Sequence, residues 1–205
     1  MSPDDIGIQL FENAAATAAA LIAIILAVGP VSGAHLNPVV TMIAFGWRDM
    51  SSGDAGVYVL AQVAGAGVGA VIANLMYELP AIELSTTVRS GAGQWLAEVV
   101  ATMGLVLVIF GVVRSNRASV APFAVGAYIG AAYFFTSSTS FANPAVTLAR
   151  MLSDTFAGIS PSSVLPFILA QCLGGAIGYV LARALYPTLV NRRCPDVHDS
   201  GVTPG

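Results

Sequence analysis

The stretch Ser-Gly-Ala-His-Leu-Asn-Pro-Val-Val-Thr at residues 32–41 recurs in altered form at residues 138–147, as Ser-Thr-Ser-Phe-Ala-Asn-Pro-Ala-Val-Thr. Each copy follows a long apolar run and opens a short one. An Ala-Gln pair and closely spaced glycines come after each copy, at 61–62 and at 170–171. In a membrane sequence, two matched Asn-Pro breaks predict two half-helices that meet near the middle of the bilayer, as in a transport site.

The composition places the chain among polytopic membrane proteins. Hydrophobic residues make up 56% and charged residues 9%, and the mean hydropathy is +0.79, whereas soluble domains are about 25% charged. The eight basic residues are scattered arginines, so no patch for nucleic acid is expected. Two cysteines and two distant histidines predict no metal site or cofactor. The sequence shows no Ser-His-Asp set or phosphate loop, which argues against an enzyme.

Apolar run lengths predict the membrane topology. A helix needs about 20 residues to cross a bilayer, and five runs reach that length: 13–31, 55–77, 93–113, 120–138 and 163–186. The runs from Asn37 to about Trp47 and from Asn143 to about Leu152 are too short. Asn favours the N-cap and Pro the first helical position, so each Asn-Pro pair begins a re-entrant helix.

The fold class is therefore all-α, with five spanning helices and two re-entrant half-helices in one domain, residues 1–205. We divide it into a first repeat at 1–77, a second repeat at 78–190 and a polar tail at 191–205. Glycines spaced by four, such as Gly65 with Gly69 and Gly174 with Gly178, are predicted to be surfaces for close helix packing only.

Arginine placement predicts the orientation, because arginines favour the cytoplasmic side. If the loop before Asn37 enters from the cytoplasm, most arginines lie inside, and only Arg89 and Arg150 lie outside. The N-terminus is then outside and the C-terminus is in the cytoplasm, in the plasma membrane.

The two boxes, Asn37-Pro38-Val39 and Asn143-Pro144-Ala145, resemble the paired Asn-Pro-Ala motifs of the aquaporin, or major intrinsic protein, family. The context from Ser32 and the Trp-Leu-Ala-Glu stretch that ends at Glu98 are similar as well. The resemblance covers about 13–187. It implies an inverted-repeat channel of the solute-conducting branch and a homotetramer.

The chain departs from that family pattern in its first half. The family has three spans in each half, but only 36 residues precede Asn37, and two spans with connections do not fit in them. The first helix of the first half is absent from the sequence as given. A natural five-span variant, a start codon assigned too late and a shortened chain all stay open, and we favour the second.

The resemblance implies how the pore works. The N-termini of the two half-helices face each other, and each carries about half a positive charge, which repels cations. The Asn37 and Asn143 side chains cap these helices and donate hydrogen bonds to passing water or solute. Nothing is chemically converted.

The resemblance also implies a selectivity constriction near the outer mouth. Its members here are Thr17, Ser140, Val146 and either Tyr133 or Ala131. Val146 stands where the family usually has Arg, so the constriction should be wide and weakly polar.

Arg150 lies one turn beyond Val146 on the same helix face. It either partly replaces the missing charge at the mouth or is a surface or interface arginine.

Three further residues border the predicted pore. Glu98 lies inside a span, and we expect it to accept hydrogen bonds from re-entrant-loop backbone rather than to take part in transport. His35 either lines the pore or packs beside it. Val39 replaces the usual Ala of the first box and is interpreted as a neutral packing change.

The sequence predicts a passive channel for water and small neutral solutes, such as glycerol-like polyols, urea-like amides and metalloid hydroxides such as arsenite. A non-conducting or partner-dependent five-span protein is the alternative. A strict water channel is less favoured, and so is a coupled transporter, because Glu98 is the only ionisable group deep in a span.

Overall fold

The computed structural model describes residues 4–187, and within that range the chain is helical without strands. The helices in chain order are α1 (Ile6–Ser32), α2 (Pro38–Gly46), α3 (Ser52–Met76), α4 (Ala92–Arg114), the 3-10 turn η1 (Ala118–Val120), α5 (Ala121–Phe135), α6 (Pro144–Arg150) and α7 (Pro161–Leu185). Five segments in this part of the chain are long and apolar enough to cross a membrane: α1, α3, α4, η1 with α5, and α7. The two short helices, α2 and α6, complete the predicted five-plus-two pattern. The predicted tail at 191–205 lies outside the described residues.

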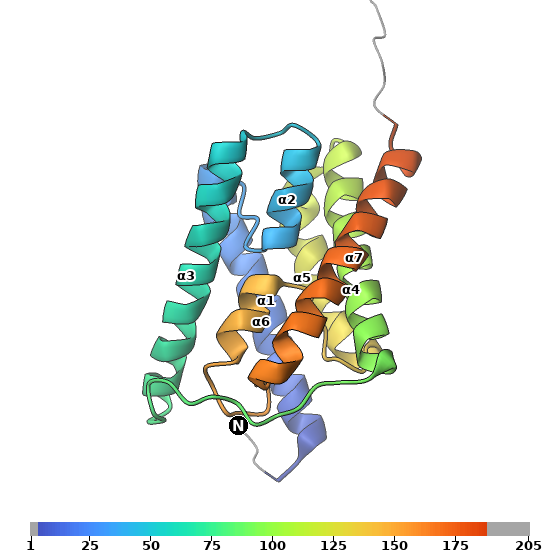
Figure 1. Cartoon of the computed structure of the whole chain (residues 1–205). Helices are drawn as coiled ribbons and strands as arrows, with labels where there is room; N and C mark the ends of the chain where they lie inside the picture. Colours follow the sequence, from blue (N-terminus) through green and yellow to red (C-terminus); the bar gives the residue numbers. More distant parts are fainter. Residues whose placement is uncertain (1–3, 188–205) are drawn as a thin grey trace, which may run out of the picture.

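The two short helices meet end to end in the middle of the bundle (Figure 1). The longer helices surround them: α4 packs along α7, α1 packs along α5, and α3 lies beside α2 and α6. The loops that precede α2 and α6 therefore reach the centre from opposite ends of the molecule. This arrangement places the two Asn-Pro pairs next to each other at mid-depth.

The Asn-Pro pairs begin the short helices as capping chemistry predicts. Asn37 and Asn143 have extended backbone conformations, and each side chain accepts a hydrogen bond from the first turn. Asn37 Oδ1 accepts from Val39 N at 3.0 Å, and Asn143 Oδ1 accepts from Ala145 N at 3.0 Å. The following proline has no N–H, so it leaves no unpaired donor at the first helical position.

Two predicted helix boundaries were wrong. Helix α1 begins at Ile6 rather than near 13, because Asp5 Oδ1 caps it by accepting from Ile8 N at 3.0 Å. Helix α5 ends at Phe135 rather than 138. Thr136 turns to an extended conformation there, since the next residues form the re-entrant loop and not another helical turn.

The glycine surfaces differ between the two halves. A Cβ atom added at Gly174 or Gly178 would meet the backbone of α4, so these glycines allow α7 to pack closely against α4. A Cβ atom at Gly65 or Gly69 would meet nothing within 4 Å. The predicted packing role therefore holds for α7, while the glycine face of α3 is open within residues 4–187.

Candidate functional site

The two re-entrant loops are joined by a reciprocal pair of hydrogen bonds. Asn37 Nδ2 donates to the carbonyl of Ala142 at 2.7 Å, and Asn143 Nδ2 donates to the carbonyl of Leu36 at 2.8 Å. Each amide nitrogen carries two hydrogens, so one hydrogen on each side chain is left for another acceptor. Both asparagines border a cavity inside the helix bundle, which is described below. The capping asparagines thus fasten the loops together and present a donor to the cavity.

A buried carboxylate holds the second loop. Glu98 on α4 is fully buried and accepts from the backbone N–H groups of Phe141 at 2.9 Å and Ala142 at 2.8 Å. Ser138 Oγ donates to it at 2.6 Å, and Gln171 Nε2 on α7 donates at 2.7 Å. Four donors around one carboxylate satisfy the charge in an apolar surrounding. Its contacts in the structure are with the loop and α7.

A hydrogen bond from a glutamine to a threonine holds each half-helix. Gln171 Nε2 donates to Thr147 Oγ1 at 2.8 Å, and Gln62 Nε2 donates to Thr41 Oγ1 at 2.9 Å. Each threonine lies four residues after its box asparagine. In the second half Gln171 also reaches Glu98, whereas in the first half no described carboxylate accepts from Gln62. The two halves therefore share a framework but not the buried charge.

His35 lies in the first loop and borders the cavity. Its Nδ1 lies 3.1 Å from Thr41 Oγ1, and its backbone N–H donates to Tyr58 Oη at 3.3 Å. Tyr58 Oη in turn donates to the carbonyl of Ser32 at 3.0 Å. The Tyr58 hydroxyl on α3 thus accepts a backbone hydrogen bond from the first loop, as Glu98 does from the second loop.

A cavity of about 1020 Å³ runs through the bundle beside both asparagines. Residues of α1, α2, α4, α5 and α6 and the two loops line it. Asp49 and Ser119 border one end, and Arg150 and Tyr133 belong to the other. Its walls are mostly apolar, with polar groups at the loops and the two ends. This shape suits the passage of small molecules rather than covalent chemistry.

The sequence-predicted constriction residues Thr17, Tyr133, Ser140 and Val146 all border this cavity. They come from α1, α5, the second loop and α6. Tyr133 Oη and Thr17 Oγ1 lie 3.2 Å apart, which connects α5 to the neighbouring α1. Ala131, the alternative to Tyr133, is exposed and does not border the cavity.

Arg150, the last residue of α6, reaches into the same end of the cavity. Its Nη2 donates to Tyr133 Oη at 2.7 Å, and its guanidinium lies 4.3 Å from the centroid of the Phe141 ring. These contacts place the guanidinium beside the cavity, which favours the partial replacement of the missing charge over a surface or interface arginine.

A second arginine contacts the same ring. Arg89, in the connection between α3 and α4, lies 5.0 Å from the centroid of Phe141. It donates to three carbonyls, those of Gly158, Ser138 and Phe156. Burial, and second the charge of Arg150, lower the pKa of Arg89 to about 10, so it stays charged at neutral pH. Its side chain joins the loop before α6 to the loop after it.

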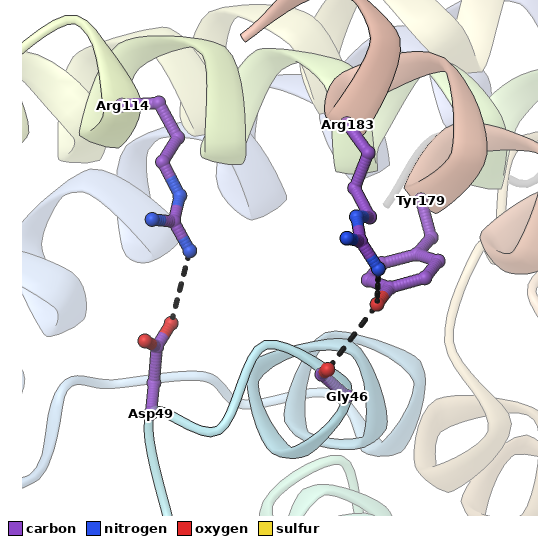
Figure 2. A network of polar contacts seen from close by, with 5 residues as sticks. All are labelled: Gly46, Asp49, Arg114, Tyr179 and Arg183. Carbon is purple, nitrogen blue, oxygen red and sulfur yellow. Dashed lines mark hydrogen bonds and ion pairs between the residues drawn. The ribbon is translucent and has the colours of Figure 1, made fainter. Parts of the chain in front are cut away.

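The C-terminal end of α2 and the residues just after it are held by two polar contacts (Figure 2). Arg114 from α4 reaches Asp49 at 3.7 Å, and its guanidinium lies over Trp47. From α7, Tyr179 Oη donates to the carbonyl of Gly46 at 3.2 Å. Because the Arg114–Asp49 pair is partly exposed, it contributes only about 0–1 kcal/mol.

Several residues of the site had no role in the sequence interpretation. The sequence shows Gln62 and Gln171 only as part of a repeated Ala-Gln pair, and they follow Thr41 and Thr147 by 21 and 24 residues, so their spacing does not reveal the matched contacts. Phe141 carried no signal, because its role depends on arginines that approach from separate segments. Within residues 4–187, no group of three His, Cys, Asp or Glu side chains is placed to hold a metal ion.

Comparison with known proteins gives consistent matches. Residues 2–142 match the family model described as major intrinsic protein. The chain is 45% identical over 185 residues to aquaglyceroporin AqpS of Rhizobium meliloti (strain 1021), covering 90% of this chain and 78% of that protein. It is 34% identical to aquaporin NIP1-4 of Oryza sativa subsp. japonica, over 80% of this chain and 61% of that protein. It is 29% identical to the probable aquaporin AqpM of Archaeoglobus fulgidus, over 86% and 75%.

Proposed function

The chain belongs to the major intrinsic protein family, a family of membrane channels and not of enzymes, and on that basis we propose that it is a passive channel of the solute-conducting type. The family supports a channel for water and small solutes. The finer proposal is that glycerol-like polyols, urea-like amides and uncharged metalloid hydroxides such as arsenite pass through the cavity beside Asn37 and Asn143.

The reciprocal asparagine contact carries this proposal. Asn37 and Asn143 are held by each other's loops, and each keeps one amide hydrogen for a passing acceptor. A solute that leaves bulk water needs replacement hydrogen bonds at the narrow centre, and these fixed donors provide them. The rest of the wall is mostly apolar, so binding stays weak enough for release.

Cation exclusion follows from the orientation of α2 and α6. Their N-termini face each other, and each contributes about half a positive charge. A cation at the centre would meet both ends and would lose its hydration shell in an apolar cavity. We therefore propose that protons and metal cations do not pass.

The proposed breadth of the solute range rests on Val146. It borders the cavity at the predicted constriction and brings no guanidinium of its own, while the guanidinium that reaches this end of the cavity belongs to Arg150, one turn further along α6. Thr17 and Ser140 are small as well. AqpS, the relative at 45% identity, carries the name aquaglyceroporin, which supports a passage wide enough for a polyol.

The setting of the channel is proposed on weaker grounds. The chain is a multi-pass membrane protein, and we propose the plasma membrane, with the N-terminus outside and the C-terminus inside. The family resemblance supports a homotetramer. The division into repeats 1–77 and 78–190 stays a prediction, supported by the matched Thr41–Gln62 and Thr147–Gln171 contacts.

One observation favours a partner-dependent form as the second candidate. A groove of about 430 Å³ runs between α3 and the half-helices, bordered by Tyr58, Gln62, Gly65 and Val146. Gln62 Oε1 is buried without a hydrogen-bond partner among the described residues. If another helix must cover this groove, the chain alone will be leaky or inactive.

Swelling measurements on purified protein in lipid vesicles test the proposal. Vesicles that contain the protein should take up water, glycerol, urea and arsenite faster than vesicles without protein. The flux should not depend on a proton gradient. Rates equal to those of empty vesicles would support the partner-dependent alternative. Saturating flux that requires a proton gradient would instead indicate a coupled transporter.

A blocked variant provides the matched control. Val146→Trp fills the cavity with a large ring beside Asn143, so every solute flux should fall toward the rate of empty vesicles. Leu165→Trp adds the same ring to an exposed position on α7 and should leave flux unchanged. Equal rates for both variants would show that the measured flux does not use this cavity.

A further inference from the structure

One face of α7 has a counterpart on α3 that no helix covers within residues 4–187. Each helix carries a glutamine followed by glycines three and seven positions later: Gln171 with Gly174 and Gly178, and Gln62 with Gly65 and Gly69. A Cβ atom added at either glycine of α7 would meet the backbone of α4, but at either glycine of α3 it would meet nothing within 4 Å. Of the spanning window of α7, 39% is buried, against 6% for α3. The second half of the molecule thus shows that a face of this kind receives a spanning helix.

The helix that covers α7 also brings a carboxylate. Glu98 of α4 accepts from Gln171 Nε2 and from the N–H groups of Phe141 and Ala142 in the second loop. The residues at the matching places in the first half are Gln62, His35 and Leu36. The first half therefore repeats the donors, and the covering helix with its acceptor is the part that is not repeated.

These donors of the first half are largely left open. Gln62 Nε2 gives one hydrogen to Thr41 Oγ1, and its second hydrogen has no acceptor among the described residues. The Leu36 N–H makes no hydrogen bond within residues 4–187, and the His35 N–H reaches only the Tyr58 hydroxyl, at 3.3 Å. Leu36, Tyr58 and Gln62 all border the groove beside α3. A carboxylate in that groove would accept from these donors, and they would offset the cost of burying its charge.

The depth and the donors of the groove restrict its occupant. Gln62 lies near the middle of α3, so the headgroup of a membrane lipid does not reach it. A second copy of this chain that paired through its own α3 would bring donors against donors. An apolar helix with one acidic side chain near its middle complements both the glycine face and the open donors.

We propose that α3 and the first loop form a docking site for a membrane-spanning helix of a separate polypeptide. The partner packs on Gly65 and Gly69, and its glutamate or aspartate accepts from Gln62 Nε2 and the Leu36 N–H. It holds the first loop, and with it Asn37, as Glu98 holds the second. This inference names the partner of the partner-dependent form, and its effect on flux rests on the proposed channel function.

A peptide of residues 90–116, which contains α4, is the model partner, because α4 already fits the matching face of α7. Fluorescence anisotropy of the labelled peptide measures its binding to the full chain in detergent. One peptide should bind per chain, and a peptide with Glu98→Gln should bind about tenfold more weakly, since charge-assisted hydrogen bonds are lost. Gly65→Leu in the chain should abolish binding by filling the face. Gly56→Leu, nine residues earlier and so on the opposite side of α3, should bind like the native chain.

A second variant keeps the test decisive if Gly65→Leu does not fold. Gln62→Leu removes the donor and keeps the glycine face, so this chain should bind both peptides equally weakly. Absence of binding to the native chain, or equal binding of both peptides by it, overturns the proposal. A lower oligomeric mass of Gly65→Leu without peptide also overturns it, because a second copy then covers the face.

Flux in vesicles separates this inference from the channel proposal. Added native peptide should raise glycerol flux several-fold over the chain alone, and vesicles with peptide but no chain are the blank. If the chain conducts alone and the peptide does not bind, the docking site is refuted and the channel stands. If the peptide binds and the vesicles still do not conduct, the docking site stands and the channel proposal fails.

Discussion

Replacing Glu98 by Gln removes the charge that holds the second re-entrant loop and changes little else in shape. The native carboxylate accepts from the N–H groups of Phe141 and Ala142, from Ser138 and from Gln171. Glutamine keeps one acceptor oxygen and presents an NH2 group where the second oxygen was. In the variant, the new NH2 group therefore faces the Ala142 N–H and the Gln171 amide, which are both donors to the native carboxylate.

The expected magnitude follows from these contacts. Gln171 Oε1 has no partner in the described part of the chain, so rotation of that amide provides an acceptor for the new NH2 group. The Ala142 N–H has to face that NH2 group and loses its acceptor. One unpaired buried N–H, with the loss of charge-assisted bonds, costs roughly 2–3 kcal/mol. For a chain of this size, that lowers Tm by roughly 4–12 °C.

Thermal unfolding in detergent and swelling of vesicles measure the two consequences. Tm should fall by that amount, and glycerol flux should fall several-fold because Asn143 loses its fixed position. Thr102→Val is the matched control, since Thr102 is also fully buried on α4 and its hydroxyl has no partner among residues 4–187. That change should leave Tm within about 1 °C or raise it, because no hydrogen bond is lost. If Glu98→Gln is as stable and as conductive as Thr102→Val, the carboxylate does not hold the loop.

Three further changes probe other parts of the structure. Val146→Arg should narrow the constriction and lower glycerol flux relative to water in the swelling assay, and equal passage of both would refute the assignment of Val146. The hydrogen bonds from Thr86, its backbone N–H first, hold the pKa of Asp154 below its ordinary 3.8. A depressed carboxyl pKa stabilises the fold above 3.8 and loses that contribution as pH falls through the lower folded value. Proteolysis of the 83–87 segment should therefore accelerate in acid for the native chain, and Asp154→Asn should already be fast at neutral pH. Gly174→Ala should lower the free energy of unfolding by about 1–3 kcal/mol because the added Cβ atom would meet α4. Gly65→Ala should change that free energy by less than about 0.5 kcal/mol. A large effect at Gly65 would show that a further helix packs on α3.

Helix type, number and approximate position were predictable because they depend on local rules. Run length separates spanning helices from α2 and α6, and Asn37-Pro38 and Asn143-Pro144 mark helix starts through capping alone. The errors at the start of α1 and the end of α5 were local too. Asp5 added a cap that the apolar pattern does not show, and Thr136 left the helix for a loop whose carboxylate partner is on another helix.

The site was predictable only in its repeated part. Asn37 and Asn143 can be identified from their motif. Their hydrogen bonds to the carbonyls of Ala142 and Leu36 cannot, because each joins residues more than a hundred positions apart. The packing of α3 was predicted from its glycines, and the structure leaves that face open. No sequence pattern could state whether Gly65 meets another helix.

The sequence by itself determined a membrane chain with two matched re-entrant breaks, because apolar length and Asn-Pro capping act within a few residues. Tertiary structure decided which side chains share the cavity. Arg89, Phe141 and Arg150 come from three separate segments, and their stacking depends on how the loops before and after α6 fold around it.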